Sequence, residues 1–303
     1  FTTYIDQNDK TVLRFGAGIS DNPDEEIVPN PDTVGSNLPG SPSKLTTAFD
    51  PSNFLKTKAF GLAPSNTTLT IKYSHGGGID DNVNSGDVTN ISSMFRQSAF
   101  NQDLNSWDVS SVTHMREVFQ QATDFNGDVS GWDVSSVIDM AYMFTWAHAF
   151  NGDVSGWDVC SVTRMTHLFR KAYDFNGDLS NWDVSNVTDL HGMFMETESF
   201  NGDISSWDVS NVWNMYGVFY GAQSFNGDLS SWDVSSATRM TSMFYNADQF
   251  NSDISSWDVS SVTHMGDLFK SNDGFNQDIS SWDVSSVTSM GAMFDNSGVF
   301  NQD

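Results

Sequence analysis

One aspartate recurs every 25 residues through the second part of the chain, and it always follows a tryptophan. Small polar residues lie two positions before and two positions after it, as Ser206 and Ser210 do around Asp208. If such residues align in rows, their carboxylate and hydroxyl oxygens would suit Ca²⁺ or the hydroxyl groups of a carbohydrate. The candidate binding face therefore comprises Ser206, Ser210 and the aspartates Asp108, Asp133, Asp158, Asp183, Asp208, Asp233, Asp258 and Asp283.

Catalysis by these carboxylates is not expected, because all of them lie in the same sequence environment. Glycoside hydrolysis needs two carboxylates whose surroundings give them different pKa values, and a uniform row does not supply that difference. The sequence also lacks the signature motifs of serine hydrolases, nucleotide-binding loops, zinc proteases and Ca²⁺-binding loops. We therefore predict a protein that is not an enzyme and has no cofactor, with Ca²⁺ as the one ion that the aspartates favour.

Aromatic residues mark the same repeat of 25 residues. Phenylalanine opens each unit from Phe100 onward, and tryptophan stands seven residues after it. A repeat of this length indicates a solenoid, in which each unit completes its core by stacking on its neighbours. Stacking predicts a structural core ladder formed by Trp107, Trp132, Trp157, Trp182, Trp207, Trp232, Trp257 and Trp282.

Within one unit, the apolar spacing predicts a short strand followed by a short helix. Trp232 and Val234 alternate with polar residues, as one face of a strand does. The spacing i, i+3, i+4, i+7, which is that of one helix face, occurs at Met240, Met243, Phe244 and Ala247. The predicted fold is an α/β repeat solenoid, leucine-rich-repeat-like, with one short parallel strand and one short helix per coil. Neighbouring helices pack farther apart than neighbouring strands, so the stack of coils should bend with its strands on the inside. The aspartate row should therefore lie on a concave face.

Three segments follow from these patterns. Residues 1–75 are predicted to form a β-rich N-terminal cap or small domain with a proline-rich loop and strands near 11–15 and 69–73. Residues 76–99 read as an atypical first coil. Residues 100–303 contain eight repeats of 25 residues and a four-residue start of a ninth.

Acidic residues dominate the charge, which is −26 at pH 7. Residues 76–303 contain 31 of the 39 acidic groups, and a surface of this kind repels phosphate backbones, so no nucleic acid partner is expected. No apolar run has the length of a transmembrane segment. Because the chain begins at Phe1 rather than at methionine, we expect that a signal peptide has been removed.

Cysteine and asparagine residues allow two modifications. Cys160 is the one cysteine, and it stands where other units have serine, so a neutral replacement is the simplest interpretation and a free thiol or intermolecular bridge is the alternative. Sequons for N-glycosylation begin at Asn66, Asn90 and Asn186.

The repeated phrase Phe-Asn-x-Asp-Ile/Leu/Val-Ser-x-Trp-Asp-Val-Ser-x-Val-Thr-x-Met-x-x-Met-Phe covers residues 88–303. It resembles the repeat of 25 to 26 residues found in bacterial surface lipoproteins and cell-wall proteins, and it is similar to BspA-like leucine-rich repeats. This resemblance implies a secreted or surface-attached protein with a leucine-rich-repeat-like fold. It also implies an adhesive or structural role without an assigned activity.

Three functions are consistent with these observations. The first is a non-enzymatic cell-surface or extracellular scaffold or adhesion protein that binds an extracellular protein or glycan. The second is a subunit of an extracellular filament, formed when solenoids of identical chains stack end to end. The third is an acidic face that binds Ca²⁺ or carbohydrate.

Overall fold

The structure is a computed structural model that describes residues 2–5, 11–14, 70–72 and 88–302. The chain divides into two compact units, Phe1–Asn82 and Val83–Asp303. In the first unit, strands β1 (Thr2–Ile5), β2 (Thr11–Arg14) and β3 (Thr70–Lys72) form an antiparallel sheet in that order. The strands predicted near 11–15 and 69–73 are confirmed, whereas the proline-rich loop lies outside the described residues.

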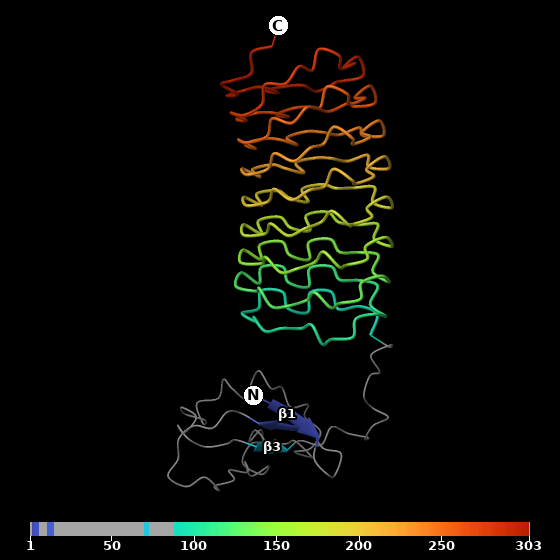
Figure 1. Cartoon of the computed structure of the whole chain (residues 1–303), viewed down its shortest axis with the longest axis vertical. Coiled ribbons are helices and arrows are strands. Elements are labelled where there is room, and N and C mark those ends of the chain that lie inside the picture. Colours follow the sequence, from blue (N-terminus) through green and yellow to red (C-terminus); the bar gives the residue numbers. More distant parts are fainter. Residues whose placement is uncertain (1, 6–10, 15–69, 73–87, 303) are drawn as a thin grey trace, which may run out of the picture. The chain divides into compact units, whose positions relative to one another are not determined.

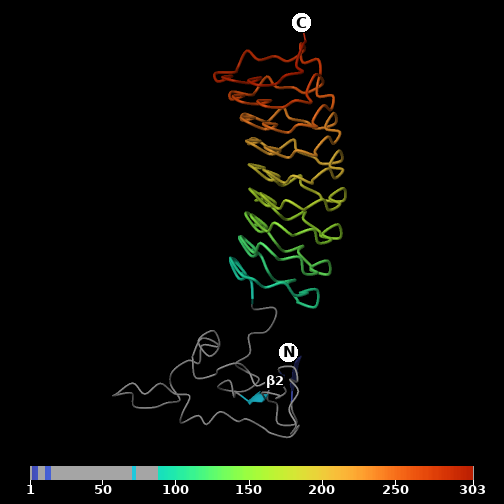
Figure 2. The ribbon, with the colours of Figure 1, turned by 90° about the vertical axis from the view of Figure 1, so that its left-hand side faces the viewer.

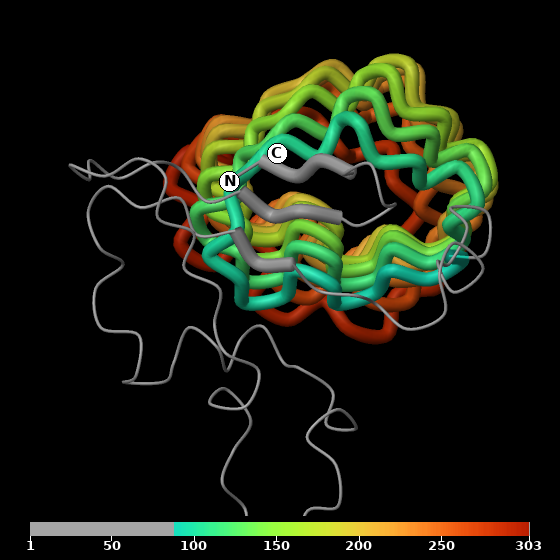
Figure 3. Tube along the Cα trace, turned by 90° about the horizontal axis from the view of Figure 1, so that it is seen from below, coloured from blue at the N-terminus to red at the C-terminus, as the bar shows by residue number. Residues whose placement is uncertain are grey.

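The described part of the second unit is a stack of coils, one for each repeat (Figures 1 and 2). Single residues at equivalent positions, such as Asn214 and Arg239, form parallel β-bridges between neighbouring coils. Seen along the stack, successive coils overlie one another and turn gradually about its axis (Figure 3). The shift between paired residues is 25, except that Asn90 pairs with His114 in the first coil. The stacking of equivalent residues that the period predicts is therefore confirmed.

The predicted α/β fold, with one strand and one helix per coil, is wrong. Residues 88–302 contain no helix and no strand longer than a single bridging residue. Residues 240–247, which were predicted to be helical, form three overlapping β-turns, 240–243, 242–245 and 244–247. The amide of Met243 donates to the carbonyl of Met240 at 3.2 Å, and the amide of Ala247 donates to that of Phe244 at 3.2 Å. All four side chains are buried, so two successive turns with apolar ends reproduce the spacing of a helix face.

The residues predicted to form a strand also lie in and between turns. The amide of Trp232 donates to the carbonyl of Leu229 at 3.1 Å, and the amide of Ala237 donates to that of Val234 at 2.8 Å. Trp232 and Val234 are buried and Asp233 is exposed, so the inward and outward alternation is present without a strand. Because no helix widens one side of the coil, the reason for predicting a concave face is removed.

Two residues in every coil have a left-handed backbone, and they are the third residues of the turns that replace the helix. In one coil these are Ser242, with φ of 56°, and Asn246, with φ of 54°. A positive φ at the third residue is what a type II turn requires. All positive φ values among the described residues fall at these two places, and three of the residues concerned are glycines. An α-helix cannot continue through such residues, which is why the helix prediction fails.

Alternate amides of these turns donate along the stack. The amides of residues 240, 242, 244 and 246 each donate to a carbonyl of the following coil at 2.9 Å. The amides of residues 243, 245 and 247 instead close turns within the coil. Backbone groups of a buried turn need partners, and here the neighbouring coil supplies about half of them.

Aromatic rings fill the centre of the stack. Phe219 and Phe225 of one coil have ring centroids 4.0 Å apart, and Phe219 lies 5.6 Å from Phe244 of the next coil. Neighbouring indoles stack at 6.2–6.4 Å. Each indole from 132 to 282 also donates its N–H to a carbonyl of the preceding coil, as Trp207 does to Leu179 at 3.1 Å. The indole can therefore be buried without leaving its donor unpaired.

Replacing Ser242 with glycine should stabilise the protein by about 0.5–1 kcal/mol, because glycine adopts a positive φ without the steric cost of a Cβ. Thr241→Gly is the matched control at the adjacent residue, where φ is not positive, and it should destabilise the protein by a similar amount. Urea unfolding gives both values. A loss of stability in Ser242→Gly, as a helix would show, would contradict the turn structure.

Candidate functional site

The eight aspartates that follow tryptophan are exposed, but each carboxylate is part of a local turn. Asp208 accepts a hydrogen bond from the amide of Ser210 at 3.0 Å, and Asp133 accepts bonds from the amide and the hydroxyl of Ser135 at 3.1 and 2.6 Å. In all eight units the aspartate accepts a hydrogen bond from the backbone amide two residues later. This is the geometry of an Asx-turn, which stabilises the backbone at the start of a turn.

A second row of aspartates has the same arrangement. Asp203 accepts hydrogen bonds from the amide of Ser205 at 2.9 Å and from its hydroxyl at 2.7 Å. The hydrogen bond from the backbone amide recurs in every unit from 125 to 299. Each of these coils therefore presents two carboxylates that its own turns hold in place.

Hydrogen bonds to the carboxylates favour their ionised form. The hydroxyl and then the amide of Ser210 lower the pKa of Asp208, and the amide and then the hydroxyl of Ser205 lower the pKa of Asp203. The pKa of Asp133 is lowered by Ser135 although the charge of Asp108 acts in the opposite direction. Asp133, Asp203 and Asp208 are therefore ionised at neutral pH, and the stability that their lowered pKa values contribute is lost only as pH falls below about 3.8.

The aspartate rows do not form metal-binding clusters. Across the described residues, no group of three or more histidine, cysteine, aspartate or glutamate side chains could hold a metal ion. Ser206, the other residue predicted for this face, donates its hydroxyl to the carbonyl of Ser180 at 2.9 Å. The predicted binding face is thus an exposed acidic surface whose side chains also hold turns and coils together.

The remaining predicted residues occupy structural positions. The indoles from 132 to 282 are buried in the core, while Trp107 in the first full coil is 36% exposed. The invariant asparagines form a ladder, in which the amide of Asn226 donates to Oδ1 of Asn201 at 2.9 Å, and this bond recurs from 101 to 301. This asparagine ladder joins each coil to the next.

The candidate modification sites differ in their surroundings. Asn90 and Asn186 are exposed, and the side chain of Asn186 donates to the carbonyl of Cys160 at 2.8 Å. Asn66 lies outside the described residues. Cys160 is half-buried, and a hydrogen bond to the carboxylate of Asp158 raises the pKa of its thiol.

The second half of each coil carries a surface that the sequence predictions missed, which we call the variable strip. It consists of the solvent-accessible residues in segments 113–124, 138–149, 163–174, 188–199, 213–224, 238–249, 263–274 and 288–299. Residues at equivalent places differ from coil to coil in these segments, whereas the first half of each coil is nearly the same throughout. Except for Arg96, every lysine and arginine in residues 88–302 lies in these segments, as does every tyrosine.

Aromatic and basic side chains of the variable strip form a row across several coils. The guanidinium of Arg116 lies 4.7 Å from the ring centre of Tyr142, which lies 4.9 Å from the ring of His167. His167 lies 4.3 Å from His191, which contacts Tyr216 edge-on at 4.8 Å. One side chain from each of five successive coils contributes to this row, so a ligand that touched it would contact several repeats at once.

His167 is the buried member of the row, with 6% of its surface exposed. Burial, followed by the charges of His191 and Arg170, lowers the pKa of His167 to about 4. Its ring packs against Gly192, where a Cβ would come within 2.3 Å of Nδ1. Within the described residues, Nδ1 has no hydrogen-bond partner. The imidazole is therefore neutral at physiological pH.

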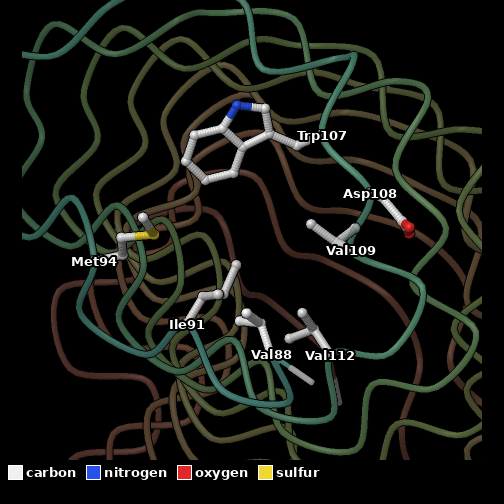
Figure 4. A pocket seen from close by; sticks show the side chains of 7 residues that line it. All are labelled: Val88, Ile91, Met94, Trp107, Asp108, Val109 and Val112. Atoms are coloured by element: carbon white, nitrogen blue, oxygen red, sulfur yellow. The ribbon is translucent and has the colours of Figure 1, made fainter. Parts of the chain in front are cut away.

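An apolar pocket of about 340 Å³ lies at the first described coil (Figure 4). Its lining consists of apolar side chains and Asp108, whose carboxylate points away from the others (Figure 4). The apolar residues occupy core positions of the first two described coils: Val88, Ile91, Met94, Trp107, Val109 and Val112. This pocket is therefore the end of the described core, and it brings no reactive groups together.

A comparison with protein families identifies the family to which the repeats belong. A family described as "Mycoplasma protein of unknown function, DUF285" matches residues 74–175, 152–250 and 226–303. The chain belongs to this family. The three overlapping DUF285 matches are consistent with a bacterial surface repeat, but they do not confirm the relationship to BspA-like leucine-rich repeats. No curated protein and no solved structure matches the chain. In the described portion of this DUF285 chain, no helix has the length and hydrophobicity needed to cross a membrane.

The stability of this DUF285 chain should fall as pH decreases from 6.5 to about 4. In that range the unfolded chain binds a proton at His167 that the folded chain does not, and the loss should reach about 2–3 kcal/mol. His191, whose pKa is also lowered by burial, adds to the loss. Asparagine tolerates a positive φ, so His167→Asn should fold and should remove most of the change of unfolding free energy with pH. Urea unfolding at several pH values measures this slope. An unchanged slope would show that other groups control it.

Proposed function

We propose that this chain is a non-enzymatic scaffold, secreted or attached to the cell surface, that binds an extracellular protein or glycan through the variable strip. The observation that carries the proposal is the division of each coil into a constant half and a varied half. The constant half supplies the asparagine ladder, the Asx-turns and the indole bonds that join the coils. The varied half is therefore where side chains can differ without loss of stacking.

The composition of the variable strip suits recognition. Tyrosine, tryptophan and arginine are the residue types that dominate binding energy at interfaces. Tyrosine and tryptophan bury large areas with few rotatable bonds, and arginine offers a planar group that stacks on rings and donates several hydrogen bonds. Trp213 is 42% exposed, although six of the eight units have threonine at its position. Because the backbone beneath is fixed by the neighbouring coils, these side chains are presented on a rigid support, which lowers the entropy cost of binding.

The aspartate rows have a different role in this proposal. Their carboxylates are repeated without variation and are engaged in turns, so they carry little information with which to distinguish partners. Their negative potential keeps the chain soluble and repels surfaces of like charge. A ligand that bound to these rows would be selected by its charge alone.

The double variant Trp213→Thr with Tyr216→Thr tests this proposal, because both replacements use residues that other coils have at the same places. On a glycan array and on immobilised extracellular-matrix proteins, we expect the wild-type chain to bind at least one probe. The double variant should weaken that binding by about tenfold. Asp208→Asn is the control, since asparagine can form the same turn, and it should leave the binding within about twofold of the wild type.

Two outcomes would count against the proposal. One is the absence of binding to every probe by the folded wild-type chain. The other is a loss of binding in Asp208→Asn that the double variant does not show, because this would assign the interaction to the aspartate rows. Equal melting temperatures for the variants exclude unfolding as the cause.

A further inference from the structure

A pocket of about 330 Å³ lies within the variable strip, where Gly221 interrupts a column of longer side chains. Gly221 has a φ of 65° and occupies the left-handed place of its coil, which Glu196 and Asn246 occupy in the coils on either side. All three residues line the pocket, and a Cβ at Gly221 would come within 3.1 Å of the Cγ of Glu196. Tyr220 and Tyr245 line one part of the pocket, and Glu198 and Gln223 complete it.

The groups that line this pocket are acceptors and neutral donors. They comprise two carboxylates, two phenols and two amides, and no lysine, arginine or histidine is among them. The carboxylate of Glu196 is paired with Lys171 at 3.2 Å. Glu198 is exposed and, among the described residues, forms no ion pair. Such a lining disfavours anions, because a negatively charged ligand would face the carboxylate of Glu198 and find no cationic side chain among the lining residues.

The same strip already holds cations in sites of this composition. Lys171 places its ammonium 4.1 Å from the ring centre of Trp146 while it contacts Glu196. Lys270 lies 5.9 Å from the ring centre of Tyr245 and contacts Asp267 and Asp295 at 3.4 and 3.3 Å. In both cases an aromatic ring and at least one carboxylate share one ammonium group, a combination in which cation–π attraction adds to ion pairing.

Tyr220 offers the same combination without a cation of this chain. Its ring stacks on Tyr245 with centroids 4.5 Å apart and an angle of 3° between the planes. Burial, Tyr245 and the charge of Glu196 together raise the pKa of Tyr220, so the phenol stays neutral and can donate a hydrogen bond. No lysine or arginine within the described residues lies over this ring.

We infer that the pocket around Gly221 binds an ammonium or guanidinium group, presented by a lysine or arginine side chain of a basic partner protein. This inference rests on the proposed function and specifies the partner at one place in the variable strip. Glu198 supplies the charge and the tyrosine pair supplies the aromatic surface. The side-chain carbonyl oxygens of Gln223 and Asn246 accept hydrogen bonds from the remaining N–H groups of the cation. The net charge of −26 attracts basic partners over longer distances.

The test measures the binding of fluorescein-labelled tetralysine by fluorescence anisotropy at physiological ionic strength. Glu198→Gln removes one charge from the pocket. Gly221→Asn places a side chain in the pocket, with a residue that Asn246 shows to be compatible with this backbone, and it requires the Glu196 side chain to shift, since the new Cβ would lie 3.1 Å from its Cγ. Each variant should weaken the affinity about tenfold. Fully acetylated tetralysine, which has the same length but no ammonium groups on its side chains, should bind the wild type at least about tenfold more weakly.

Two matched controls separate the pocket from the overall charge. Asp208→Asn removes one charge from the aspartate row. Ser271→Asn introduces asparagine, as Gly221→Asn does, at the equivalent left-handed place of a coil outside the pocket. Both should stay within about twofold of the wild type. If Asp208→Asn weakens binding as much as Glu198→Gln, tetralysine is held by net charge and the inference fails.

The inference also fails if acetylated tetralysine or a neutral oligosaccharide binds as tightly as tetralysine, because the pocket would then recognise uncharged polar groups. Failure here does not remove the proposed function. If only the cation site is wrong, the wild-type chain should still bind an extracellular probe, and the double variant Trp213→Thr with Tyr216→Thr should still lose that binding. If that binding is absent as well, both proposals fall.

Discussion

Hydrogen bonds between successive coils are the interaction on which this structure depends. A single coil of turns has no helix or sheet of its own to satisfy its backbone, so half of its turn amides need carbonyls of the next coil. The asparagine ladder and the indole N–H groups extend the same principle to side chains. A coil is therefore stable only between neighbours, and the sequence must repeat at a nearly constant length.

This constraint determines which residues are free to take part in function. The residues whose side chains join coils in the asparagine ladder or hold the Asx-turns are constant, and the aspartates that resemble a ligand row belong to this group. At the place of Trp213, other coils have a threonine whose hydroxyl donates to the preceding coil, and Trp213 replaces this bond with an exposed ring. Gly221 stands where the coils on either side have Glu196 and Asn246. In the variable strip, rings, cations and a few carboxylates are combined in different ways from coil to coil.

The sequence predicted the stacking because equivalent aromatic residues recur at a constant interval, and only stacked coils bury them all. It did not predict the turns, because apolar residues at 240, 243, 244 and 247 fit both a helix face and two turns with apolar ends. The glycines at 192, 217 and 221 were the available signal, since helix interiors disfavour glycine and left-handed turn positions favour it. For the binding surface, the missed signal was the contrast between the constant and the varied halves of the repeat.

Removal of coils tests the central claim most directly. Deletion of residues 200–224 joins Ser199 to Phe225 and preserves the register of every remaining column, so the protein should fold with an unchanged cross-section in small-angle X-ray scattering. Its length should decrease by about 5 Å, the spacing of adjacent chains in a hydrogen-bonded stack. Deletion of residues 200–212, which is smaller but breaks the register, should abolish cooperative unfolding. If the larger deletion proves as disruptive as the smaller one, or if both are tolerated, the bonds between equivalent residues do not hold this molecule together.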